Sequence, residues 1–314
     1  MKWTSMAYLL LILLQNQDGE KAINDNLTIT QEGKTVSTIS RNAHTFPVFP
    51  LLDMDKYNKW VNELDRKTFR EPANARFDDN GLIVSGQNGS RLKRREFLKR
   101  YYEYLYSSGP ASVEVPTYPV YPKVDAELLA SLRSKQIGYY VTYFNSNNRD
   151  RSHNIALAAK AIDSAVIFPG ETFSFNQVVG IRTTGKGYRR AGVIVRGELS
   201  EGVGGGICQV SSTLFNAVDR AGLNIVKRYS HSRHVPYVPP GRDATVSWGG
   251  PDFVFRNAYN QPVMIRAFAG EGSMAVSVFS SDVIEFSPRR VPSTSNRLPE
   301  EINDPSPKPA NGKK

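Results

Sequence analysis

The chain has 314 residues, of which 40% are hydrophobic and 22% charged, and it contains a single cysteine. This length allows two domains of roughly 100–200 residues, the composition excludes a wholly disordered chain, and one cysteine excludes an intramolecular disulfide. The net charge of +10 favours a polyanionic partner, which could be nucleic acid, an anionic membrane surface or an anionic cell-wall polymer.

The N-terminus begins with Lys2 and a continuous apolar run over residues 6–14. This run is shorter than the about 20 residues of a membrane-spanning helix, and it is typical of the apolar part of a signal peptide. No clean cleavage site follows it. Residues 1–19 are therefore predicted to be a signal peptide or an N-terminal anchor that could associate with the membrane. Export to the cell wall or to the outer face of the cytoplasmic membrane argues against nucleic acid as a partner.

The first half of the chain predicts a spacer and a small module. Residues 20–45 are polar and are predicted to be a spacer, and residues 46–124 are predicted to form a small α/β module. Apolar residues recur at helical spacing in two stretches, and an Asn-Gly pair between apolar segments is a hairpin signal. The predicted elements are helices over 55–68 and 92–106, a hairpin at 75–84, a strand over 112–115 and a proline-rich linker over 116–122.

The second half, residues 125–285, predicts a domain built mainly from antiparallel strands with two principal helices. One helix is expected over 155–164, capped by Asn154 or Ser152, and the other begins at Cys208 and ends before Gly222. Strands are expected at 137–144, 165–168, 173–175, 191–195, 225–229, 235–238, 245–248, 253–256, 263–268 and 274–279. The fold class is thus α+β. Residues 286–314 are rich in proline, serine, asparagine and lysine and are predicted to be a disordered tail.

Cys208 follows three consecutive glycines and begins a helix. Such a turn exposes backbone N–H groups, and the positive end of the helix dipole favours a thiolate. Cys208 is therefore a candidate nucleophile, and the amides of Gly204, Gly205 and Gly206 could bind an oxyanion. The alternative is that Cys208 is a small buried residue at a tight turn.

Two of the four histidines lie about twenty residues after Cys208. If the helix packs against the strand that follows it, His231 or His234 could reach Cys208 as a general base, and Asp243 could orient the histidine. We expect Cys208, His231 and Asp243 to be the catalytic residues. The residues expected to bind substrate are Gly204, Gly205, Gly206, Gln209, Ser211, Ser212, His234 and Arg242, although Ser211 and Ser212 could instead bond only to backbone.

Other chemistries are less well supported. A zinc site built from Cys208, the two histidines and Asp243 matches none of the usual spacings, so no metal is predicted. The glycines lack the residues that complete a nucleotide-binding loop, so no cofactor is predicted. A carboxylate mechanism, with Asp243 or Glu171 as the acid, stays open.

Several long motifs in the second half occur in a fixed order: Pro169–Asn176, Gly187-Tyr188, Gly204–Ala217, His231-Ser232, Val235–Val238 with Pro239, Gly241–Val246 and Asp252-Phe253. With these motifs, the stretch from about Gly138 to Ser280 resembles the VanW family. Residues 46–124 more loosely resemble the peptidoglycan-binding-like domain that often precedes VanW domains. The resemblance implies a bacterial, extracytoplasmic protein of the cell envelope.

The resemblance implies peptidoglycan, or another anionic wall polymer, as the partner. Three functions remain open on the sequence. The protein could be a cysteine-dependent enzyme that transfers or hydrolyses acyl groups at stem peptides. It could be a non-catalytic wall-binding module in which Cys208 is structural. It could also cleave glycan strands with a carboxylate acid.

Overall fold

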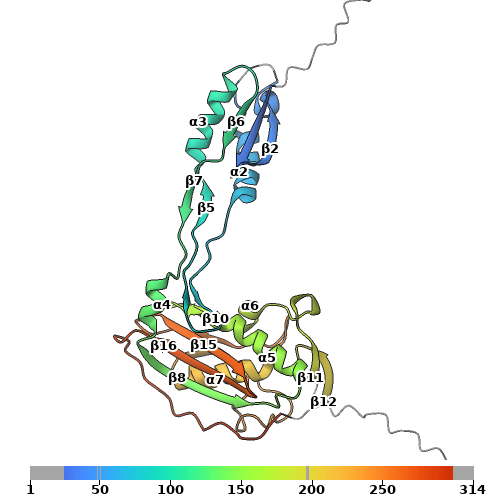
Figure 1. Cartoon of the computed structure of the whole chain (residues 1–314), viewed down its shortest axis with the longest axis vertical. Helices are drawn as coiled ribbons and strands as arrows, with labels where there is room; N and C mark the ends of the chain where they lie inside the picture. The colour runs from blue at the N-terminus through green and yellow to red at the C-terminus, as the bar shows by residue number, and fades with distance from the viewer. Residues whose placement is uncertain (1–24, 48, 50, 196–197, 300–314) are drawn as a thin grey trace, which may run out of the picture. The chain divides into compact units, whose positions relative to one another are not determined.

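The computed structural model describes residues 25–47, 49, 51–195 and 198–299 (Figure 1). The predicted signal peptide or anchor at 1–19 lies outside this part of the chain. In the described ranges, no helix is both long enough and apolar enough to cross a bilayer.

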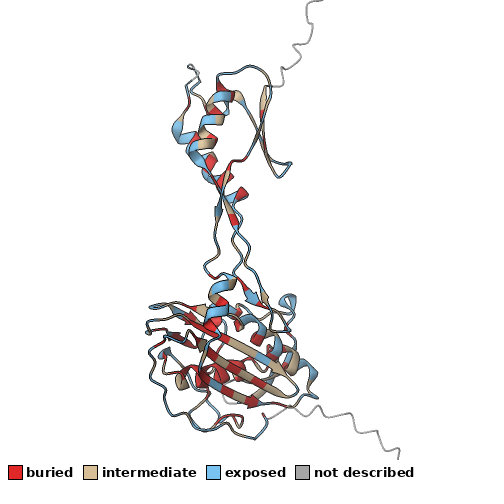
Figure 2. Cartoon of the chain, turned by 60° about the vertical axis from the view of Figure 1, so that its left-hand side comes forward, coloured by how far each residue is buried: buried red, intermediate tan, exposed pale blue. Residues whose placement is uncertain are grey.

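Two compact units share the chain, and each contains two separate stretches of it. The N-terminal unit comprises residues up to 73 together with 87–123, and the C-terminal unit comprises 74–86 together with the chain from 124 onward. Figure 2 shows that the buried residues gather in the interior of each unit. Each unit therefore has a core of its own.

The N-terminal unit combines helices with short strands: β1 (Asn26–Gln31), β2 (Lys34–Ser40), the 3₁₀ helix η1 (Arg41–His44), α2 (Met54–Thr68), β5 (Gly89–Leu92), α3 (Arg94–Leu105), β6 (Ala111–Glu114) and β7 (Thr117–Val120). The central strand β1 is antiparallel to β2 and parallel to β6. β5 pairs antiparallel with β7. This arrangement confirms a small module of mixed helix and sheet.

Local sequence explains the start of α2. The Asp53 side chain accepts hydrogen bonds from the backbone N–H groups of Asp55 and Lys56, which replaces partners that the first turn of a helix lacks. The two helices and the sheet then bury one apolar cluster, formed by Leu27, Ile29, Leu52, Tyr57, Val61, Leu64, Leu92, Phe97, Tyr101, Tyr104, Leu105 and Val115.

Three predictions for this half of the chain are wrong. The predicted spacer at 20–45 contains β1 and β2, because Leu27 and Ile29 are fully buried in this core. The proline-rich stretch 116–122 is not a free linker, since it contains β7. The predicted hairpin forms, as β3 (Arg76–Phe77) and β4 (Ile83–Val84), but it belongs to the C-terminal unit.

The rest of the C-terminal unit consists of α4 (Ala126–Leu132), β8 (Lys135–Tyr143), α5 (Arg149–Ile162), β9 (Val166–Ile167), β10 (Thr172–Ser174), α6 (Phe175–Val179), the 3₁₀ helix η2 (Thr184–Lys186), β11 (Arg190–Val195), β12 (Glu198–Val203), α7 (Ile207–Arg220), β13 (Asn224–Lys227), β14 (Val254–Arg256), β15 (Val263–Gly270) and β16 (Ser273–Ser280). The main sheet has the order β8-β16-β15-β9, and every neighbouring pair is antiparallel. Glu271 and Gly272 both have positive φ and close the tight β15–β16 hairpin. The predicted mixed, mainly antiparallel domain is confirmed.

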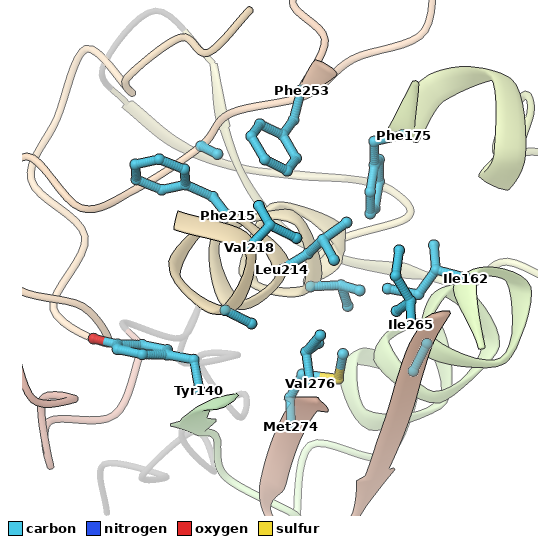
Figure 3. Packing of buried hydrophobic residues seen from close by; sticks show 14 of the residues in the cluster. Tyr140, Ile162, Phe175, Leu214, Phe215, Val218, Phe253, Ile265, Met274 and Val276 are labelled. Atoms are coloured by element: carbon cyan, nitrogen blue, oxygen red, sulfur yellow. The ribbon is translucent and has the colours of Figure 1, made fainter. Parts of the chain in front are cut away.

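Helices α5 and α7 are the two principal helices, and they pack against each other and against the main sheet. Figure 3 shows Leu214 and Val218 of α7 among side chains from the surrounding elements, including Phe175 and Phe253. Gly138 of β8 lets α7 approach closely, because a Cβ atom there would lie 2.3 Å from the Ala217 carbonyl oxygen. The sheet therefore fixes where α7 lies, and with it the position of Cys208.

Two smaller sheets complete the unit. One has the order β10-β14-β13, and the other is the β11–β12 hairpin. The strands predicted at 235–238 and 245–248 do not form. The apolar residues of these segments are nevertheless buried in the core, namely Val235, Tyr237, Val238 and Val246. The alternation of apolar and polar residues there reflects burial and not strand structure.

The ends of two further elements also differ from the sequence-based prediction. The cap of α5 is Asn148, whose side chain accepts from the Arg151 N–H, so the helix begins at Arg149, earlier than the expected start at residue 155. The tail predicted from 286 is ordered as far as 299. The Arg289 guanidinium lies 3.0 Å from Asp219 Oδ1 and donates to the Leu223 carbonyl, and Phe286 and Val291 pack against the core. Residues 300–314 lie outside the described part.

Candidate active site

The turn before α7 depends on its glycines. Gly204 and Gly206 have φ values of +88° and +104°, which L side chains rarely adopt. A Cβ atom at Gly205 would lie 2.5 Å from the carbonyl carbon of Ala191. The glycines thus allow a sharp turn packed against β11, and this turn places Cys208 in the first turn of the 14-residue helix α7.

Cys208, His231 and Asp243 come together as the sequence predicts. The Nδ1 atom of His231 lies 2.7 Å from Asp243 Oδ2, which also accepts from the His231 backbone N–H at 2.6 Å. The imidazole also lies close enough to the Cys208 thiol to lower its pKa. The Sγ atom itself donates to the Val246 carbonyl oxygen at 3.5 Å and lies 3.7 Å from the Thr245 hydroxyl. Because Nδ1 is engaged by the carboxylate, Nε2 is the nitrogen left for the sulfur. The order nucleophile, base and orienting carboxylate is that of a catalytic triad.

The environment of the triad favours an ion pair. Burial alone would raise the pKa of the Cys208 thiol, but the hydrogen bond and positive charge of His231 outweigh it and lower that pKa. Burial would likewise lower the pKa of His231, but hydrogen bonds to Asp243 and Cys208 raise it to about 9. Burial opposes ionisation of Asp243, and its hydrogen bonds with His231 still leave its pKa lowered. At neutral pH the arrangement therefore favours a thiolate beside an imidazolium.

Two serines tie the start of α7 to the segment that carries Asp243. Ser211 donates to the Ala244 carbonyl, while Ser212 accepts from the Ala244 N–H at 2.9 Å and donates to the Cys208 carbonyl at 2.7 Å. Both serines are fully buried. Their predicted role in substrate binding is therefore wrong, and the alternative of bonding to backbone holds. They fix the distance between nucleophile and carboxylate.

Cys208 lies at a cleft of about 570 Å³ that opens between the β11–β12 hairpin, the start of α7 and the loops around His231 and Ser247. The lining residues are Arg151, Arg182, Gly192, Val193, Ile194, Leu199, Gly202, Val203, Gly204, Gly206, Ile207, Cys208, Gln209, His231, Arg233, His234, Val235, Pro236, Tyr237, Thr245, Val246, Ser247, Trp248, Pro251 and Pro299. The cleft is large enough for a peptide segment.

The three glycines do not contribute equally. The Gly204 N–H donates to the Arg189 carbonyl at 2.9 Å, so its predicted role as an oxyanion donor is wrong. Gly205 is buried against Ala191 and does not line the cleft. Among the described residues, the N–H groups of Gly206 and Cys208 have no hydrogen-bond partner, and both residues line the cleft. These two amides are the available oxyanion donors.

Of the remaining predicted binding residues, only His234 is exposed in the cleft. Gln209 lines it but is fully buried; its amide accepts from Arg151 and donates to Thr142 and to the Tyr143 carbonyl. Arg242 does not line the cleft, because its guanidinium bonds Asn216 and Asp219. Both were predicted to bind substrate, and their side chains are instead held by neighbouring protein groups.

Other residues at the cleft were not predicted. Arg151 and Arg182 contribute charge, the β11–β12 hairpin contributes an apolar wall, and Trp248 is 54% exposed at the cleft. None of these residues belongs to a motif with a chemical meaning. The one available signal was the position of Thr245 and Trp248, two and five residues after Asp243.

The alternative chemistries find little support. In the part of the chain that the structure describes, no group of three or more histidine, cysteine, aspartate or glutamate side chains could hold a metal ion. Glu171 does not line the cleft, and among the residues that the structure describes no other aspartate or glutamate does. Asp243 is engaged by His231. Glycan cleavage commonly needs two carboxyl groups that flank the bond, and the described lining residues supply none.

Replacing His231 by asparagine is expected to remove the charge that stabilises the thiolate. Burial then raises the pKa of Cys208, and the rate of its alkylation by iodoacetamide at pH 7 should fall by about 10-fold or more. The alkylation rate is measured from about pH 5 to about pH 10. In the variant the rate should still be rising at the alkaline end of this range, whereas the wild-type rate should level off at a lower pH. His234→Asn is the matched control and should keep the wild-type profile. Identical profiles for wild type and His231→Asn would contradict the ion pair.

Comparison with known proteins agrees with the motifs. The family model described as VanW like protein matches residues 150–279. The chain is 60% identical to the uncharacterized protein YoaR of Bacillus subtilis over 281 residues, which cover 89% of this chain and 93% of that protein. It is 36% identical over 111 residues to the vancomycin B-type resistance protein VanW of Enterococcus faecalis, covering 33% of this chain and 40% of that protein. No solved structure matches. The resemblance of the second half of the chain to the VanW family is thus confirmed, and the chain belongs to the family of VanW-like proteins.

Proposed function

We propose that this protein is a cysteine-dependent enzyme that cleaves or transfers acyl groups at the stem peptides of peptidoglycan. The observation that carries the proposal is the triad of Cys208, His231 and Asp243 at a peptide-sized cleft. A merely structural cysteine requires neither a hydrogen-bonded histidine nor a carboxylate on the far side of that histidine.

The geometry supports a two-step reaction. The Cys208 thiolate attacks the carbonyl carbon of a peptide bond, and the Gly206 and Cys208 N–H groups stabilise the oxyanion. The His231 imidazolium donates its proton to the departing amine as the C–N bond breaks, which leaves a thioester on Cys208. Water or a second amine, deprotonated by neutral His231, then attacks the thioester, and the C–S bond breaks to restore the thiolate beside the imidazolium. Water as the acceptor gives hydrolysis, and an amine gives a new peptide bond.

Three features support a cell-wall substrate. The family includes a protein named for vancomycin resistance. The net charge of +10 suits an anionic polymer. The apolar run near the N-terminus is typical of export, which supports a location on the outer face of the membrane or in the wall. The N-terminal unit would serve as the wall-binding module.

The single cysteine allows a direct test. Purified peptidoglycan is incubated with the protein, and with the protein whose cysteine has first been blocked by iodoacetamide, and the released muropeptides are identified by mass spectrometry. We expect new products from the untreated protein and none from the blocked protein. Equal products from both would contradict thiol chemistry. No products from either, with retained binding to sacculi, would contradict the enzyme and favour a binding module.

A further inference from the structure

The described residues that line the cleft include several cationic side chains and no carboxylate. Arg151, Arg182 and Arg233 line it together with His231, whereas none of the lining residues in the described part of the chain is an aspartate or glutamate. A cleft lined by cations raises the local concentration of anionic ligands. The charge therefore indicates an anionic substrate if one of these cations is positioned to bind it.

Arg182 has a guanidinium that is held in place on one side only. Its Nη1 donates to Asn176 Oδ1 at 2.8 Å, and its charged group lies 5.6 Å from the centroid of the Phe175 ring. The Nη2 atom is buried and has no hydrogen-bond partner among the described residues. A buried donor without a partner is unfavourable, and a guanidinium presents a fork that matches the two oxygens of a carboxylate.

The partner of Arg182 is itself held rigidly. The Asn176 amide nitrogen donates to the carbonyl oxygens of Ser247 and Pro251 at 2.9 and 3.0 Å, which orients its oxygen toward Arg182. The nearby carboxylate of Asp252 accepts instead from the Ser174 hydroxyl and from the Asn176 backbone N–H. The guanidinium is thus positioned by a neutral group and keeps one arm unpaired.

We propose that the cleft takes an acyl donor with a free carboxylate close to the bond that is cleaved, and that Arg182 binds this carboxylate. This inference rests on the proposed function and names its substrate class, an anionic peptide. The contact would give the Arg182 fork its missing partner and would orient the scissile carbonyl toward Cys208. Arg182 would be a specificity residue, since an amidated donor could not form the ion pair.

Two alkylating reagents provide a test that does not depend on the natural substrate. Iodoacetate and iodoacetamide both react by displacement, in which the Cys208 thiolate forms an S–C bond and iodide leaves. They differ in that only iodoacetate carries a carboxylate. We expect the ratio of the two rates, iodoacetate over iodoacetamide, to be about 10-fold higher for Cys208 than for the free thiol of N-acetylcysteine amide.

Substitutions then assign the effect to one residue. Arg182→Gln should lower the ratio by about 10-fold, and Arg182→Lys, which keeps the charge without the fork, should give an intermediate value. Arg189→Gln is the control, because it removes one exposed arginine that does not line the cleft. It should leave the ratio unchanged.

The possible failures are distinct. A ratio in Arg182→Gln equal to that of wild type would overturn the carboxylate site while leaving the nucleophile intact. If Arg182→Gln does not fold, the Arg182→Lys variant decides: a ratio of iodoacetate to iodoacetamide rates equal to that of wild type would also overturn the carboxylate site. A wild-type Cys208 that neither reagent alkylates would overturn the proposed thiol chemistry itself.

Discussion

Replacing Cys208 by serine is expected to lower the rate at which muropeptides are released by about 10⁴-fold or more. A serine hydroxyl is not ionised by the neighbouring imidazole at neutral pH, so the ready-made thiolate is lost while the shape of the site is kept. Asp243→Asn should cause a comparable loss, because the amide can no longer stabilise the imidazolium.

The measurement is the initial rate of product formation, together with the intact mass of the protein during turnover. Wild-type protein should accumulate a covalent acyl adduct at Cys208, and Cys208→Ser should not accumulate a thioester. Binding of both proteins to sacculi should be equal, which separates chemistry from recognition. A Cys208→Ser variant that retains the wild-type rate would show that the triad is not the catalytic machinery.

Replacing Gly138 by alanine is expected to reduce the free energy of unfolding by about 3 kcal/mol. The new Cβ atom would lie 2.3 Å from the Ala217 carbonyl oxygen and 2.9 Å from the Ala221 Cβ. Backbone atoms on α7 cannot yield as a flexible side chain would, so the helix has to move away from β8. Because α7 carries Cys208, the alkylation rate of that thiol should change as well.

Urea unfolding followed by circular dichroism would give the change in stability. Gly185→Ala is the matched control, since the nearest atom to its Cβ lies 3.9 Å away and its backbone φ is one that alanine accepts. Its stability should stay within about 0.5 kcal/mol of wild type. Equal stabilities of the two variants would show that the close approach of β8 and α7 is not required.

The sequence predicted the structure best where the local sequence pattern and the burial of apolar residues indicate the same element. The glycine turn and the apolar face of α7 both mark a helix that begins near Cys208, and the helix forms there. The partners His231 and Asp243 were predicted from chemistry and order alone. The sequence could not supply the distance from Cys208 to Asp243, because that distance depends on the hydrogen bonds that Ser211 and Ser212 make between α7 and Ala244.

Other predictions failed where burial occurs without regular structure. Val235 and Val246 lie in segments whose apolar alternation is typical of strands, yet these segments enter the core as loops. Arg182 was missed because a single arginine in a loop has no sequence signature; its meaning comes from Asn176 and Phe175, which belong to another element. The bounds of the N-terminal module failed because a hairpin near its middle packs with residues more than forty positions later.

Because of that hairpin, each of the two units is built from two stretches of the chain that are separated in sequence. The chain leaves the N-terminal unit after Ala73, supplies β3 and β4 to the C-terminal unit, and returns at Gln87 before leaving again after Lys123. Phe77 of β3 shares a buried cluster with Leu129 and Met264. A shortened gene that begins at residue 125 would therefore encode a C-terminal unit with part of its core missing. A protease that cuts once at Gly86 would produce two fragments. Each unit contains residues from both fragments, so the fragments should stay associated after the cut.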